Sequence, residues 1–155
     1  MRRKDREVTD PDALRDIVEA CQVCRIAMQD EEGLYIVPMN FGYEYENGRL
    51  TLYVHSAREG RKVAAFRLNG RIAFEMDCDH ELVEGRQACQ YSYRYRSLIG
   101  NGDIVELDNP DEKKKGLLAL MRRFTDRPVQ FNDKMLGVVA VFRIDVSRFS
   151  GKCHA

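Results

Sequence analysis

Apolar residues recur along this chain with a spacing that alternates between helix-like and strand-like, and the changes of period divide it into predicted elements. Asp10-Pro11 is typical of a helix start, with an N-cap residue followed by proline in the first turn. Further helices are predicted from Ser56 to Asn69-Gly70 and after Asn109-Pro110. The apolar positions that support the first helix are Leu14, Ile17, Val18 and Cys21, and those of the last are Leu117, Leu120, Met121 and Phe124.

The remaining apolar runs predict a mainly β fold. Glu46-Asn47-Gly48 lies between two alternating runs and indicates a tight hairpin. Hairpins outnumber crossovers in the resulting order of elements, which favours a small antiparallel barrel with helices packed outside. The predicted strands are 22–29, 34–45, 49–55, 71–77 and 138–146, and 89–95 with 98–107 form either one long bent strand or a pair.

Length and charge narrow the classes of protein that the chain can represent. Its 155 residues predict one domain over 1–155, with a charged N-terminal arm over 1–9. Lys and Arg number 25, as do Asp and Glu, so the net charge is zero and neither nucleic acid nor an anionic membrane is an expected partner. No apolar run spans a bilayer, and the five scattered cysteines suggest no disulfide framework. We therefore expect a cytoplasmic protein.

The segment His55–Lys62 holds the most informative candidate chemistry. Ser56 and Glu59 have the spacing of a capping box, which predicts a helix start with free backbone N–H groups. Arg58, Arg61 and Lys62 add cations within the next two turns, and together these groups suit a phosphate. The alternative is that Ser56 only caps the helix and that the cations are solvated.

Three other clusters each have a structural alternative. Cys21 and Cys24 have redox C-x-x-C spacing, but they follow a helix instead of starting one, so buried packing thiols are favoured. A second group contains soft metal ligands without the spacing of a standard zinc site, and no metal is predicted. A tyrosine run alternates with arginines and suits base stacking, although the zero net charge counts against a nucleic-acid partner. The second group is Cys78, His80 and Cys89, and the run is Tyr91, Tyr93 and Tyr95.

Most of the chain, from about residue 13 to 152, resembles the FMN-binding split-barrel family related to pyridoxamine 5'-phosphate oxidase. The stretch H-S-A-R-E-G-R-K at 55–62 is the specific part of the match, and the chain is most similar to the branch of 5-nitroimidazole-resistance (Nim-type) proteins. This resemblance implies a six-stranded antiparallel split barrel that forms a homodimer. It also implies two FMN molecules, each held in a cleft between the subunits.

The resemblance further implies roles for single residues. Four strand residues would follow the flavin ring and ribityl chain, and Ser97 would reach the flavin from the partner subunit. His55 and Ser56 would lie beside the flavin or its phosphate, and Arg61 and Lys62 would hold the phosphate. His55 is the candidate catalytic residue, with a hydrogen-bonded structural histidine as the alternative. The four strand residues are Val37, Pro38, Met39 and Asn40.

The expected function is an FMN-dependent oxidoreductase that acts on a small molecule, with nitro-aromatic reduction as the most specific activity implied. The electron donor would be NAD(P)H or another reductant. Oxidation of pyridoxamine phosphate is not expected, because residues 142–149 lack the Arg and His pair of that enzyme's C-terminal strand. Two alternatives remain: a flavin-binding module without activity, and a haem-binding relative with His55 or His80 as ligand.

Overall fold

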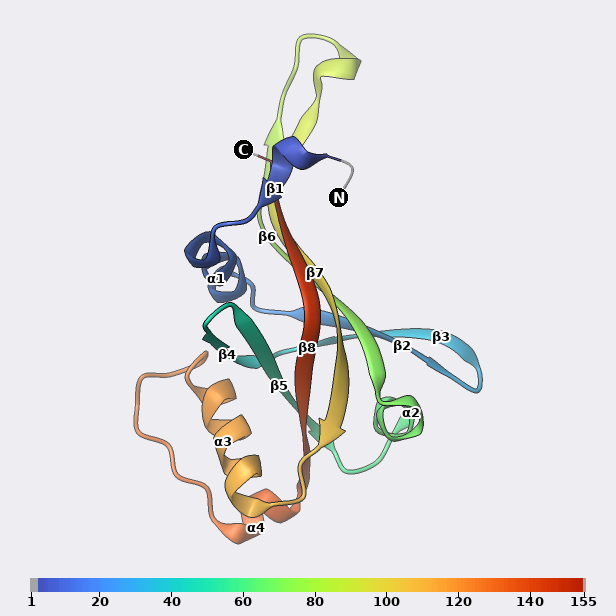
Figure 1. Cartoon of the computed structure of the whole chain (residues 1–155), viewed down its shortest axis with the longest axis vertical. Coiled ribbons are helices and arrows are strands. Elements are labelled where there is room, and N and C mark those ends of the chain that lie inside the picture. The colour runs from blue at the N-terminus through green and yellow to red at the C-terminus, as the bar shows by residue number, and fades with distance from the viewer. Residues whose placement is uncertain (1–2, 155) are drawn as a thin grey trace.

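Antiparallel strands dominate the computed structural model, which describes residues 3–154 (Figure 1). The helices are α1 (Pro11–Ala20), α2 (Arg61–Asn69), α3 (Pro110–Met121) and α4 (Asp133–Gly137), with 3-10 turns at Lys4–Arg6 and Ala88–Gln90. The strands are β1 (Glu7–Val8), β2 (Cys24–Asp30), β3 (Gly33–Met39), β4 (Gly42–Glu46), β5 (Arg49–Ala57), β6 (Arg71–Val83), β7 (Ser92–Glu106) and β8 (Val139–His154). The predicted class, mainly β with peripheral helices, is confirmed.

All strands belong to one curved antiparallel sheet in the order β3-β2-β6-β7-β8-β5-β4, with β1 added beside β8. The described residues form eight strands because the segment predicted as 34–45 breaks at Asn40 and Phe41, and because β1 adds a further short strand. The alternatives for 89–107 resolve into the single strand β7, which bends at a register shift between Asn101 and Gly102.

The inward faces of the strands form the main hydrophobic core. In β5, Leu50, Leu52 and Val54 are fully buried, as their alternation predicts. Helix α2 closes one end of the barrel, where the ring of Phe66 packs edge-on against Phe142 at 5.1 Å. Helices α3 and α4 cover the outside of β4, β5 and β8 (Figure 1) and enclose a second core. This second core contains Tyr53, Leu107, Leu117, Ala119, Leu120, Leu136 and Val141.

Several predicted boundaries are confirmed at the level of single atoms. The Asp10 carboxylate accepts a hydrogen bond from the amide of Ala13 at 2.9 Å, and Asn109 caps α3 in the same way. Asn47 has a φ of 51° and Gly48 a φ of 75°, which are the left-handed conformations that a two-residue hairpin turn requires. Local sequence therefore determines these turns and helix starts.

The predicted capping box at Ser56 is wrong. Strand β5 continues through Ala57, which pairs with Val139 of β8, so Ser56 is an extended residue and cannot cap a helix. Helix α2 begins only at Arg61, after Gly60 at φ 129°. Pairing with the central strand outweighs the local helix signal.

The predicted strands 71–77 and 138–146 are shorter than the observed β6 and β8. Strand β6 runs to Val83, past a bulge at which Asp79 adopts a φ of 56°. With β7 it forms a hairpin that projects from the body (Figure 1). Strand β8 continues beyond Val146 to His154 through further pairing with β7. Helix α4 was not predicted, although Asn132 caps it.

The cysteines are free thiols and differ in accessibility. Cys21 lies at the end of α1 and Cys24 begins β2, and both are completely buried in the main core. Burial raises the pKa of both thiols, that of Cys24 to about 12, so neither is a thiolate at neutral pH. These properties support the packing role predicted for the pair.

We expect Ellman's reagent at pH 8 to label the exposed Cys89 first and Cys153 more slowly, and to leave Cys21 and Cys24 unmodified until the protein unfolds. Replacing both core cysteines with alanine should lower the free energy of unfolding by about 1–3 kcal/mol per site without loss of bound flavin. Rapid labelling of Cys21 or Cys24 in the folded protein would contradict this assignment.

Candidate functional site

The segment from β5 to α2 forms one end of the barrel and carries four of the predicted site residues, His55, Ser56, Arg61 and Lys62. After Ala57 the chain turns through three residues that are neither strand nor helix, and Gly60 supplies the positive φ that this turn needs. The amide of Ala64 donates to the carbonyl oxygen of Gly60 at 3.0 Å, so α2 is regular from its first residue. No side chain within residues 3–154 caps this helix. Its first-turn N–H groups are therefore available to an anion.

His55 and Ser56 point to opposite sides of β5. Ser56 continues the inward set with Val54 and is buried, whereas His55 is exposed on the outer side. Partial desolvation, together with the neighbouring Lys62 ammonium, lowers the pKa of His55 below its ordinary value of about 6.5. At neutral pH the imidazole is thus uncharged and can donate or accept a hydrogen bond.

The two cations predicted to hold a phosphate differ in what they contact. The Arg61 guanidinium forms ion pairs with Asp30 at 2.7 Å and Glu32 at 3.1 Å, and it lies 4.3 Å from the centre of the Tyr35 ring. These contacts join α2 to the β2–β3 turn. Lys62 makes no ion pair with any residue of the described chain. Lys62 is therefore the cation more available to a ligand.

The strand residues predicted to follow a flavin present alternating faces. Val37 and Met39 point into the core, so only their backbone atoms reach the outer surface. Pro38 and Asn40 are exposed, and the Asn40 amide donates to the carbonyl oxygen of Gln22 at 3.0 Å. Two of these four side chains are thus available to a cofactor.

Ser97 does not join the other predicted residues within one chain. It pairs with Lys152 of β8, whereas His55 pairs with Val141, eleven residues away along the same strand. At about 3.3 Å per residue this separation is roughly 36 Å. Ser97 and His55 can meet one ligand only if they come from different copies of the chain.

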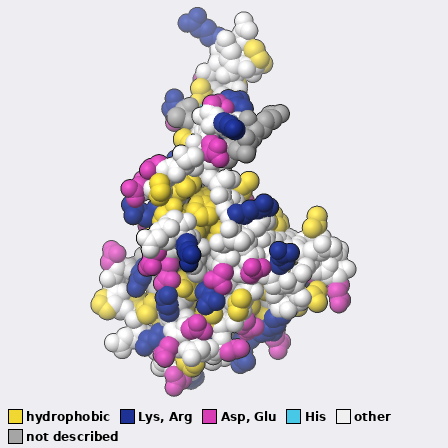
Figure 2. Space-filling model, in the orientation of Figure 1, with side chains coloured by type: hydrophobic (Ala, Val, Ile, Leu, Met, Phe, Trp, Pro, Cys, Tyr) yellow, Lys and Arg dark blue, Asp and Glu magenta, His cyan; other side chains and the backbone are white. Residues whose placement is uncertain are grey.

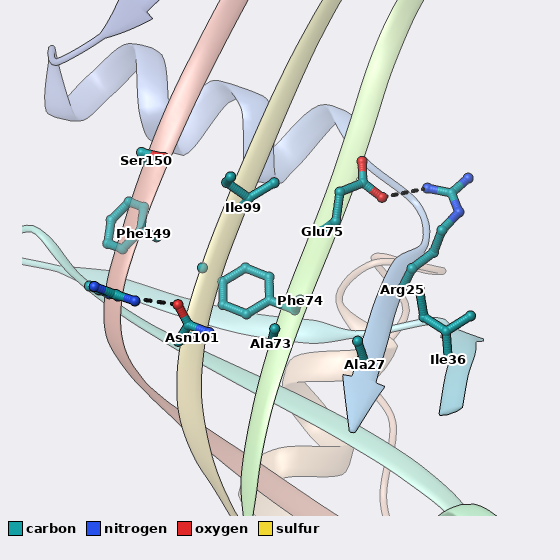
Figure 3. Close-up of a pocket in the computed structure, with 12 residues that line it drawn as sticks. Arg25, Ala27, Ile36, Ala73, Phe74, Glu75, Ile99, Asn101, Phe149 and Ser150 are labelled. Atoms are coloured by element: carbon teal, nitrogen blue, oxygen red, sulfur yellow. Dashed lines mark hydrogen bonds and ion pairs between the residues drawn. The ribbon is translucent and has the colours of Figure 1, made fainter. Parts of the chain in front are cut away.

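An apolar groove of about 500 Å³ lies on the outer face of β2, β3, β6, β7 and β8 (Figure 3). Ile36 and Ile99 are 62% and 55% exposed, which is unusual for isoleucine on a closed surface. Polar contacts border the groove. Arg25 forms an ion pair with Glu75 at 3.1 Å, and the Arg148 guanidinium donates a hydrogen bond to the side-chain oxygen of Asn101 at 3.2 Å. We call this surface the outer-face groove, and its apolar members are Ala27, Ile36, Ala73, Phe74, Ile99 and Phe149.

Sequence reasoning missed the outer-face groove because it did not assign faces to β6 and β7. The alternation of Ile99 with the buried Leu98 and the glycine at 100 was the available signal. Hydrophobic side chains also gather below the projecting hairpin on the face shown in Figure 2. An uncovered apolar surface such as the outer-face groove is typical of an interface.

The other sequence candidates are not assembled into sites. His80 contacts Asp77 at 2.7 Å, and no group of three His, Cys, Asp or Glu side chains among residues 3–154 could hold a metal ion. Arg94 and Arg96, on the basic face of the tyrosine run, are paired with Glu81 and Asp79. No helix of the described chain is long and apolar enough to cross a membrane.

Solved structures with the same architecture come from several bacteria. A provisionally assigned 5-nitroimidazole antibiotic resistance protein from Bacteroides thetaiotaomicron is 31% identical, with a TM-score of 0.82 over 95% of this chain and 86% of that one. A flavocytochrome from Azotobacter vinelandii is 18% identical, with a TM-score of 0.82 over 100% and 72% of the two chains. An FAD- and haem-binding protein from Mycobacterium smegmatis is 21% identical, with a TM-score of 0.81 over 96% and 73%.

The two more distant structures establish the fold alone, and with the first they confirm the split barrel that the sequence predicted. No curated protein sequence matches the chain significantly. The family model described as pyridoxamine 5'-phosphate oxidase matches residues 10–153. The breadth of that match, together with the similarity to the Bacteroides protein, shows that the chain belongs to the pyridoxamine 5'-phosphate oxidase family.

Proposed function

We propose that this chain is an FMN-dependent oxidoreductase that reduces nitro-aromatic compounds and binds its flavin between two copies of the chain. The observation that carries the proposal is the combination of His55 and Lys62 at the uncapped start of α2. Backbone N–H groups and an unengaged ammonium suit a phosphate monoester, and a neutral imidazole beside them suits a polar ring. The similarity to the Bacteroides 5-nitroimidazole resistance protein supports the choice of substrate class.

The residues present fit FMN. Its phosphate would meet Lys62 and the first-turn amides of α2, while Pro38 and the backbone of β3 would follow the ring. Bound FMN would supply the hydride and electron chemistry. The protein itself would orient the cofactor and the substrate and exclude water from them. His55, uncharged at neutral pH, would donate a hydrogen bond from its ring N–H to a polar atom of the cofactor or the nitro group.

The exposed surface of the chain supports a dimer. A compact monomer of 18.0 kDa should expose roughly 8,000 Å², whereas this chain exposes 10100 Å². The excess of about 2,000 Å² is of the size that an obligate homodimer buries per subunit. The outer-face groove supplies an uncovered apolar centre for that contact, and Ser97 lies on the same face of β7 as Ile99. We propose that this groove is the dimer interface.

A visible spectrum of the protein reconstituted with FMN tests the function directly. We expect a bound flavin spectrum, bleaching by NAD(P)H or dithionite without oxygen, and re-oxidation by a nitroimidazole. His55→Phe should retain the flavin and lower the rate of nitro reduction by about ten- to a hundred-fold, since the hydrogen-bond donor to the reacting group is lost. A Soret band would favour the haem alternative, and bound flavin that no nitro compound re-oxidises would favour the non-catalytic module.

Lys62→Ala should weaken FMN binding about ten- to a hundred-fold and leave riboflavin binding nearly unchanged. The reason is the loss of a charge-assisted hydrogen bond to the phosphate, worth about 1.5–3 kcal/mol. Arg61→Ala is the comparison: its guanidinium is already engaged by Asp30 and Glu32, so the loss of FMN affinity should be smaller. Fluorescence titration measures both. Equal losses for FMN and riboflavin in Lys62→Ala would exclude the phosphate role.

Ile99→Arg should convert the dimer into a monomer and abolish flavin binding, because a charge would be buried at the centre of the outer-face groove. Light scattering should report a mass near the 18.0 kDa of one chain instead of twice that value. Met135→Arg, on an equally exposed residue of α4, is the matched control and should remain dimeric. A monomeric Ile99→Arg that still binds one FMN per chain would refute the inter-subunit site.

A further inference from the structure

The turn between β2 and β3 carries three consecutive acids and contacts the start of α2. Asp30 ends β2 and pairs with Gly33, the first residue of β3, so Glu31 and Glu32 form a two-residue turn between them. The amide of Glu32 donates a hydrogen bond to the Asp30 carboxylate at 2.9 Å. A contact of this kind between an Asp side chain and the backbone two residues later fixes the carboxylate relative to the turn. Asp30 is thus oriented by its own hairpin.

The Arg61 guanidinium, at the first residue of α2, uses all three of its nitrogens on this turn. Its Nε and Nη2 donate to the two oxygens of Asp30 at 2.7 and 3.2 Å, and its Nη1 contacts Glu32 at 3.1 Å. The guanidinium also lies over the Tyr35 ring, 4.3 Å from the ring centre. A bidentate contact between arginine and a carboxylate fixes orientation as well as distance. The guanidinium is therefore held by the turn and by β3.

Asp30 is the stronger of the two carboxylate partners. Its side chain is 11% exposed, against 73% for Glu32, so solvent screens its ion pair with Arg61 less. The hydrogen bond from Arg61 lowers the pKa of Asp30 below its ordinary value, so the carboxylate is charged throughout the neutral range. Removing the charge of Asp30 should therefore release Arg61 more completely than removing the charge of Glu32.

The next residue of the helix, Lys62, is not held in this way. It makes no ion pair with any residue between 3 and 154, whereas the charge of Arg61 is already balanced by Asp30. An anion at the first turn of α2 can therefore contact the Lys62 ammonium directly. It gains the Arg61 guanidinium only if that group leaves Asp30, because a hydrogen bond exchanged for another of the same kind adds little binding energy.

We propose that Asp30 determines how strongly the α2 site prefers a phosphorylated flavin, by competing with the phosphate for Arg61. The proposal rests on the function proposed above, because it takes the FMN phosphate as the anion at this site. The carboxylate and the phosphate are alternative partners of one guanidinium, so FMN must break the Arg61–Asp30 contact before Arg61 contributes to its binding. Riboflavin has no phosphate and does not compete. The acid at position 30 thus reduces the preference for FMN over riboflavin.

A purely structural role of the Asp30–Arg61 contact predicts the opposite result. In that case the ion pair only fastens the β2–β3 turn to α2, so its loss would loosen the site and weaken the binding of FMN. Competition predicts that the loss of the acid strengthens the binding of FMN. The two roles therefore differ in the sign of the change in affinity.

The first experiment measures the FMN and riboflavin affinities of the flavin-free protein by fluorescence titration. We expect Asp30→Asn to bind FMN about three- to ten-fold more tightly and riboflavin unchanged, because the released Arg61 adds a charge-assisted hydrogen bond to the phosphate. Asparagine keeps the size of the side chain and an acceptor for the Glu32 amide. Glu32→Gln should give a smaller gain, because that carboxylate is largely solvated. This second variant also tests the competition if Asp30→Asn does not fold.

A double-mutant cycle shows whether the gain depends on Arg61. The gain should disappear when Asp30→Asn is combined with Arg61→Ala. A gain of the same size in that background would mean that Asp30 only repels the phosphate, and it would overturn the proposal. Glu106→Gln is the matched control, since Glu106 holds Arg67 in the last turn of α2 through hydrogen bonds of 2.6 and 2.9 Å. This variant should bind FMN with unchanged affinity.

The second experiment uses inorganic phosphate, followed through the backbone amide resonances of α2 by NMR. Asp30→Asn should bind phosphate more tightly than the unmodified protein, and only while Arg61 is present. If no flavin binds but this gain is observed, the proposed oxidoreductase function fails and the competition stands. If FMN binds to Asp30→Asn no more tightly than to the unmodified protein, the competition is refuted and the flavin site stands. The absence of a gain with both probes would likewise overturn the proposal.

Discussion

The pairing of β7 with β8 is the interaction on which the other parts of the structure depend. The two strands remain paired from Tyr95–His154 to Glu106–Phe142, with one register shift on the way. Beyond this ladder, β8 pairs with β5 on its other side and with β1 near its end, and β7 pairs with β6. A shift of the pairing register by one residue would turn Ile99 inward and Leu98 outward, and the other core side chains of the strand would likewise become exposed. The alternation of these two strands therefore fixes the barrel interior and the outer-face groove together.

Local signals in the sequence predicted those parts of the fold whose conformation is set by neighbouring residues. Asp10-Pro11, Asn47-Gly48 and Asn109-Pro110 act within a few residues, and the structure has the expected caps and turns at all three. The end of β8 was not predictable in this way. Ser147, Arg148 and Ser150 give no apolar alternation, and the segment is a strand because β7 and β1 offer it hydrogen-bond partners. The paired residues of β7 and β8 are about 50 positions apart, so local sequence patterns do not reveal that the two strands pair.

The sequence predicted which residues belong to the candidate site, but it predicted their arrangement only in part. The family resemblance placed His55, Arg61 and Lys62 in one segment, and the structure keeps them at one end of the barrel. The motif does not distinguish the two cations, because the ion pairs of Arg61 come from a turn 30 residues earlier. It also does not show that Ser56 is a strand residue, since the S-x-x-E pattern carries no information on β8. Contacts between distant segments decide both points.

The length of β8 has a consequence for how a functional unit is counted. Strand β8 pairs with His55 through Val141 and with Ser97 through Lys152. These two positions lie far apart along the strand, so a single chain cannot bring His55 and Ser97 together. In a symmetric dimer joined through the outer-face groove, each cleft would combine His55 of one chain with Ser97 of the other. A mixture of two inactive chains, one defective at each end, would then regain one intact cleft in every mixed pair. Each functional cleft would therefore be built from one end of each of two chains.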